Sequence, residues 1–211
     1  MSKDEKNMHG GSIPKNGAQN GHAQNGHGAA DWGSDWPSAV QELAAACVRF
    51  VATKYKVALD FSPDTLSLVD QYVRDARTDG IAAETLPVVE GAAGAYLGEV
   101  IRRAHDGVWD AEGDPETWRV LMTHVYLALN PVAMMREALT LEHDPRAALH
   151  AEPAEQEALE ARLAALGQVD EEEFFAPTTR FDVVEIAVEA LAAKAREGGL
   201  ADVRFTRDDY D

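Results

Sequence analysis

Three glycines, Gly91, Gly94 and Gly98, interrupt an apolar stripe that recurs at helical spacing over residues 83–105. Each glycine inside a helix costs roughly 1 kcal/mol relative to alanine, so such positions usually allow another backbone to come close. We therefore predict that this segment is the central helix of a packed core. The stripe consists of Leu86, Val89, Ala93, Tyr96, Leu97, Val100 and Ile101.

The flanking sequence predicts further helices and a few short strands. Helices are expected over residues 37–55, 63–79, 131–139, 151–166 and 182–197, several of them after a cap such as Asn130-Pro131. In the last of these helices, Asp182 is the expected N-cap. Extended segments are expected at residues 57–61, 107–110, 118–129 and 203–205. The fold class is therefore α+β, a helix-dominated domain over residues 37–211 with two to four short strands.

Residues 1–36 differ in composition from the rest of the chain. The five residues Ala18-Gln19-Asn20-Gly21-His22 recur directly as residues 23–27. A repeat of this kind has no apolar face whose burial could offset the ordering entropy, so we expect a disordered Gly/Asn/His-rich tail. Its removal should leave the melting temperature nearly unchanged, unless Trp32 or Trp36 packs on the body.

The chain is strongly acidic, with 37 Asp and Glu residues against 19 Lys and Arg, a formal net charge of −18. This charge repels phosphate backbones and anionic lipid surfaces, so we expect neither direct nucleic-acid binding nor membrane binding. The N-terminal sequence lacks the apolar segment of a signal peptide, and the single cysteine excludes an intramolecular disulfide. A cytoplasmic location is expected.

Common catalytic motifs are absent from the sequence. There is no Gly-Xaa-Ser-Xaa-Gly elbow, phosphate-binding loop or dinucleotide fingerprint, and the histidines lack the spacing of a helical zinc site. We therefore expect no metal and no cofactor, and we favour a protein that is not an enzyme. Cys47 lies on the apolar stripe of the first helix and is predicted to be a buried hydrophobic residue.

Glu99 follows the last of the three glycines and precedes two arginines, Arg102 and Arg103. The i+3 and i+4 spacing favours a surface ion pair. The alternative is that Glu99 is a polar anchor beneath the strand that carries Trp109. We assign Gly91, Gly94, Gly98, Glu99 and Trp109 structural roles.

An acidic run, Asp170-Glu171-Glu172-Glu173, is followed directly by Phe174-Phe175. An acidic rim around an aromatic anchor can capture a basic protein surface, although a pair of phenylalanines can also simply attach a loop to the body. Our candidate partner-binding residues are Glu171, Glu172, Glu173, Phe174 and Phe175.

The stretch from Phe61-Ser62-Pro63-Asp64-Thr65-Leu66 to Gly91-Ala92-Ala93-Gly94-Ala95-Tyr96-Leu97-Gly98-Glu99-Val100-Ile101, with Trp109 after it, resembles a family of small bacterial domains of unknown function. Those domains combine a helix after a short strand with a GAYLGEV-type helix, a Gly-Xaa-Trp strand and a later Asn-Pro turn. The resemblance covers about residues 57–140. It implies a fold and leaves the activity open.

These observations favour a non-enzymatic acidic module that regulates, inhibits or connects another protein, one with a basic surface. One alternative is a hydrolase or transferase in which His105 and His124 converge with Glu99 or Asp110 in one cleft. The other alternative is a mimic of nucleic acid, which would require carboxylates in regular rows.

Overall fold

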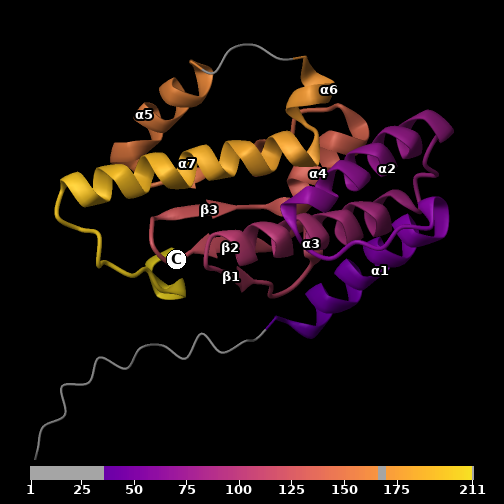
Figure 1. The fold of residues 1–211 in the computed structure, drawn as a ribbon, viewed down its shortest axis with the longest axis horizontal. Helices are drawn as coiled ribbons and strands as arrows, with labels where there is room; N and C mark the ends of the chain where they lie inside the picture. Colours follow the sequence, from indigo (N-terminus) through magenta and orange to yellow (C-terminus); the bar gives the residue numbers. More distant parts are fainter. Residues whose placement is uncertain (1–35, 166–169, 211) are drawn as a thin grey trace, which may run out of the picture. The chain divides into compact units, whose positions relative to one another are not determined.

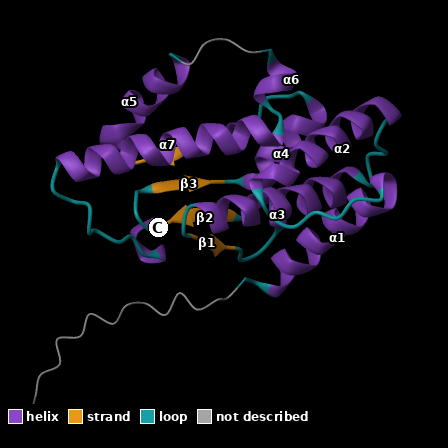
Figure 2. Ribbon diagram, viewed as in Figure 1, coloured by secondary structure: helices purple, strands orange, loops and turns teal. Residues whose placement is uncertain are grey.

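The computed structural model describes residues 36–165 and 170–210. This part of the chain contains seven α-helices and one four-stranded antiparallel sheet, which confirms the helix-dominated α+β class (Figures 1 and 2). The helices are α1 (Ser38–Tyr55), α2 (Leu66–Asp79), α3 (Leu86–Ala104), α4 (Pro131–Thr140), α5 (Pro153–Ala164), α6 (Glu171–Phe174) and α7 (Pro177–Glu197). The strands are β1 (Gly107–Asp110), β2 (Arg119–Met122), β3 (Leu127–Leu129) and β4 (His150–Ala151), in that spatial order.

Helix α3 is the centre of the core, as its glycines predict. It packs against α1 and α4, and all residues from Val89 to Ile101 are buried. A Cβ atom on Gly94 would lie 2.6 Å from the Cα atom of Val132 in α4, so the absence of a side chain permits the close approach of the two helices. A Cβ atom on Gly98 would lie 2.2 Å from the indole of Trp109. Neither position therefore has room for a side chain.

The segment predicted as one strand over residues 118–129 is a hairpin of β2 and β3, so that prediction is wrong in its topology. The hydroxyl of Tyr210 fixes the turn: it accepts a hydrogen bond from the Leu127 N–H (3.0 Å) and donates to the carbonyl of Met122 (2.7 Å). Residues 203–205 form no strand; Phe205 donates a single backbone hydrogen bond to Thr123. Residues 57–61 are likewise not a strand.

Helix α7 begins at Pro177, five residues before the predicted N-cap at Asp182. Its first turn is satisfied from α2, where the carboxylate of Asp70 accepts hydrogen bonds from Thr178 N (3.1 Å) and Thr178 Oγ1 (2.6 Å). Asp182 is exposed within the helix. At α4 the predicted cap is confirmed, because the side chain of Asn130 accepts from Ala133 N at 2.9 Å.

Trp36, assigned to the tail by its sequence, packs on the body. Its ring meets the ring of Phe61 edge-on at 5.3 Å, and the guanidinium of Arg103 lies 5.2 Å from its centre. The ordered body therefore includes this tryptophan. The remainder of the predicted tail, residues 1–35, and the last residue of the helix predicted over residues 151–166 lie outside the described residues.

Candidate partner-binding site

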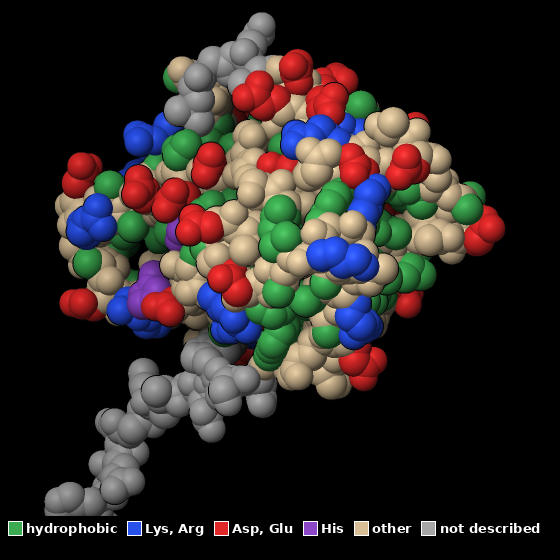
Figure 3. Space-filling view, turned by 45° about the vertical axis from the view of Figure 1, so that its right-hand side comes forward, with side chains coloured by type: hydrophobic (Ala, Val, Ile, Leu, Met, Phe, Trp, Pro, Cys, Tyr) green, Lys and Arg blue, Asp and Glu red, His purple; other side chains and the backbone are tan. Residues whose placement is uncertain are grey.

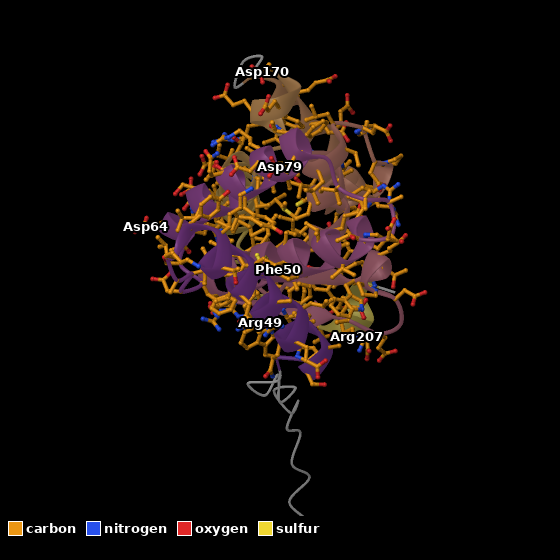
Figure 4. The ribbon with its side chains drawn as sticks, turned by 90° about the vertical axis from the view of Figure 1, so that its right-hand side faces the viewer. Arg49, Phe50, Asp64, Asp79, Asp170 and Arg207 are labelled. Atoms are coloured by element: carbon orange, nitrogen blue, oxygen red, sulfur yellow. The ribbon has the colours of Figure 1, made fainter. Side chains whose placement is uncertain are left out.

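The acidic run predicted to bind a partner forms the short helix α6 and its cap. Asp170 is the N-cap, and its side chain accepts from Glu173 N at 2.9 Å. Glu171, Glu172 and Glu173 are all exposed, and Glu172 also pairs with Arg77 of α2. Figure 3 shows acidic side chains gathered over this end of the molecule, and Figure 4 places Asp170 at its edge, above Asp79 of α2.

The two phenylalanines after the acidic run face different environments. Phe174 is 39% exposed, whereas Phe175 is 6% exposed and belongs to the hydrophobic core. The guanidinium of Arg180 lies 4.3 Å from the ring centre of Phe174 and 5.2 Å from that of Phe175. Phe175 thus attaches α6 to the body, and Phe174 is the aromatic side chain of the pair that solvent reaches.

Phe174 lies at a cavity of about 430 Å³ between α5, α6 and α7. Most of the wall is apolar and includes Leu149, Leu159, Leu163 and Val183. A volume in this range, with apolar walls and a few polar groups, is typical of binding pockets. The cavity can therefore accept an apolar side chain or a small apolar molecule.

One side of this cavity is formed by a buried ion pair. Glu137 in α4 is completely buried and pairs with Arg180 in α7. Glu137 also accepts hydrogen bonds from His143 Nδ1 and from the backbone N–H of Asp144, both at 2.9 Å. Burial lowers the pKa of Arg180, and the neighbouring carboxylate opposes that shift. Because these contacts neutralise the pair, the exposed carboxylate that lines the cavity is that of Glu160.

Glu137 and Arg180 were not among the predicted site residues, because no local sequence pattern links residues so far apart. The available signal was a carboxylate at position 137 in a helical segment that is apolar apart from Arg136 and Thr140. A buried carboxylate requires a partner of opposite charge. This requirement predicts a cationic side chain next to Glu137, but it does not identify the residue that supplies it.

Glu99 combines the two roles that its sequence context allowed: it pairs with arginines of its own helix, and it anchors the strand that carries Trp109. Its carboxylate accepts hydrogen bonds from Arg102 Nε (2.8 Å), Arg103 Nε (2.6 Å) and Trp109 Nε1 (3.1 Å). The expected surface location is wrong, because Glu99 is completely buried. Burial raises the pKa of this carboxylate, but the hydrogen bonds from two arginines and an indole outweigh burial and hold the pKa below its ordinary value.

The residues named for an enzymatic alternative make separate contacts. His124 pairs with Asp106 at 3.2 Å, whereas His105 packs against the ring of Phe181 with ring centres 5.7 Å apart. Asp110 forms ion pairs with two arginines of other segments. Within the described residues, none of the four groups forms a hydrogen bond or an ion pair with another of them.

Within the described ranges, no group of three or more His, Cys, Asp and Glu residues could hold a metal ion. No helix there is both long and apolar enough to cross a bilayer. Cys47 is buried, as predicted.

The acidic side chains are distributed unevenly over the visible surface. On the face shown in Figure 3, basic side chains are interspersed with acidic ones away from α6.

The comparisons with known proteins identify a family without a known activity. Residues 13–129 match the model of a family of unknown function, DUF6278. No curated protein and no solved structure matches the chain.

Proposed function

We propose that this chain, which belongs to the DUF6278 family, acts by binding another protein that presents a basic surface. Regulator, inhibitor and adaptor are the roles that such binding would serve. The proposal places the contact at the cavity between α5, α6 and α7, with Phe174 at its centre. A cytoplasmic location is part of the proposal and rests on the use of a single, buried cysteine.

The position of Phe174 is the observation that carries the proposal. A large aromatic side chain is partly exposed at an apolar cavity, although its neighbour Phe175 is buried in the core. Aromatic residues in such settings dominate the binding energy of protein interfaces. An apolar side chain of the partner that entered the cavity would contact this ring and remove it from water.

The charges around the cavity favour a basic partner. Glu171 and Glu173 are exposed beside Phe174, and Glu160 lines the cavity from α5. The whole chain has a net charge of −18, so it attracts a basic protein at long range, as the carboxylates near the cavity do at short range. Electrostatic complementarity of this kind accelerates association and rejects acidic proteins.

Quantitative affinity capture from the native host tests the proposal, with the wild-type chain compared with two variants. Phe174→Ser removes the proposed anchor, and Val88→Ser is the matched control, because Val88 is 49% exposed and lies outside the cavity. A stoichiometric basic protein should be recovered with the wild type and the control and be depleted with Phe174→Ser. Equal recovery by all three, or no stoichiometric protein at low and moderate salt, would contradict the proposal.

A further inference from the structure

A second groove, of about 400 Å³, lies at the opposite end of α7 from α6. The turn between β2 and β3 contributes Val125 and Tyr126 to its wall, and α7 contributes Leu191. The segment after α7 completes the wall with Leu200, Val203 and Phe205. The groove shares none of its lining residues with the cavity at Phe174.

Two large apolar side chains of this groove are exposed to solvent. Leu200 is 57% exposed and Val203 is 38% exposed, and they lie three residues apart just after the glycines that end α7. Isolated apolar residues on a surface are ordinary, but here two of them share one groove with other apolar wall residues, which concentrates apolar surface at one place.

The charged residues that line the groove are mostly acidic. They are Glu152, Glu155, Glu197 and Lys194, and the ammonium of Lys194 is already paired with Glu155. The carboxylates of Glu152 and Glu197 are exposed. A cationic occupant therefore complements the groove, whereas an anionic one is repelled.

The walls also indicate the secondary structure of the occupant. Addition of a strand requires unpaired backbone groups at a sheet edge. Here the walls are formed by α7, the start of α5 and two turns, and no strand residue of the sheet lines the groove, so the groove presents no sheet edge. An amphipathic helix presents apolar side chains at i, i+3, i+4 and i+7.

We infer that the groove formed by the end of α7, the β2–β3 turn and residues 200–205 binds a basic amphipathic α-helix of another protein. The apolar face of that helix contacts Leu200 and Val203, and its lysines or arginines lie beside Glu152 and Glu197. This groove is separate from the cavity at Phe174, so binding at one of the two sites does not depend on binding at the other.

The test uses a synthetic helical peptide of about four turns, with leucines on one face and lysines on the other. A second peptide has the same composition with its leucines spread around the helix. Binding to the full chain is measured by fluorescence anisotropy, and the binding site is mapped by amide chemical shifts. We expect the amphipathic peptide to perturb residues 191–205 and to bind at least tenfold more tightly than the peptide without an apolar face.

Two sets of variants locate the contact. Leu200→Ser combined with Val203→Ser should weaken binding at least tenfold, and Glu152→Gln combined with Glu197→Gln should weaken it severalfold at low salt. The control, Val57→Ser combined with Val88→Ser, also removes two exposed valines, from outside the groove, and should bind as the wild type does.

Circular dichroism confirms that each variant is folded, as expected for exposed positions. Phe174→Ser should also bind this peptide normally, which separates the inference from the proposed function. Absence of binding, equal binding of both peptides, equal binding by the groove and control variants, or shifts centred on α6 would each overturn the inference.

Discussion

Substitution of the three glycines of α3 by alanine provides a graded test of how the core is packed. At an ordinary helical position, Gly→Ala stabilises a protein by up to about 1 kcal/mol through helix propensity. Gly91→Ala should follow this rule, because the tightest contact of the new Cβ atom would be with the end of the Leu43 side chain, at 3.3 Å, and Pro115 Cβ would lie at an ordinary contact distance of 3.9 Å. A leucine side chain can move aside at little cost.

The other two positions should respond in the opposite direction. At Gly94 the new atom would lie 2.6 Å from the backbone of Val132, so α4 must move as a unit. At Gly98 it would meet Trp109, whose indole is held by its hydrogen bond to Glu99. Overpacking typically costs about 1–3 kcal/mol. The upper part of that range applies where the backbone must shift, as at Gly94, or where rigid rings must shift, as at Gly98. After the gain in helix propensity, the net loss in the free energy of unfolding is about 2 kcal/mol.

Urea and thermal unfolding measured by tryptophan fluorescence can resolve these effects. A loss of about 2 kcal/mol corresponds to a fall of about 4–8 °C in the melting temperature of a domain of this size. Gly91→Ala should melt at or above the wild-type temperature, whereas Gly94→Ala and Gly98→Ala should melt below it. If all three variants were equally stable, the close approach of α3 to α4 and Trp109 would be refuted.

Three further predictions concern single residues. Asp70→Ala should lower the free energy of unfolding by about 1 kcal/mol in urea titrations, because it removes the cap of α7, while Asp182→Ala should change it by less than about 0.5 kcal/mol. Glu99→Gln should lower the free energy of unfolding by about 2 kcal/mol at pH 7. This loss is smaller than that for a fully buried ion pair, because both arginines are partly exposed. Since the folded-state pKa of Glu99 is depressed, its contribution is present above the unfolded pKa of about 4.3 and should fade in unfolding curves recorded at lower pH. Burial raises the pKa of the Cys47 thiol to about 12, so a thiol reagent should modify it only in denaturant.

The sequence predicted those features whose cause lies within a few residues. Asn130 caps α4 through an N–H three residues away, and the glycines of α3 could be recognised from their place in an apolar stripe. The start of α7 has one local signal, Pro177 at its first position, but its N-cap residue Ala176 has no capping side chain, and the carboxylate that satisfies its first turn, Asp70, is 108 residues from Thr178. Local patterns therefore located the helices better than their ends.

The same distinction applies to the candidate site. The composition of residues 170–175 identified an acidic, aromatic segment, yet it could not separate Phe174 from Phe175. Which ring faces inward depends on how α6 packs against Arg180 of α7, and that packing involves the buried carboxylate of Glu137. The cavity is assembled from several distant segments, so no local pattern could indicate it.

The most direct test of the proposed function is the kinetics of binding between this chain and its captured partner at several ionic strengths. Raising the salt from about 0.01 M to about 0.15 M shortens the Debye length from about 30 Å to about 8 Å. We predict that this change slows association at least about tenfold, that Glu171→Gln with Glu173→Gln slows association at low salt, and that Phe174→Ser accelerates dissociation. Association that is independent of salt, together with wild-type dissociation of Phe174→Ser, would contradict the proposal.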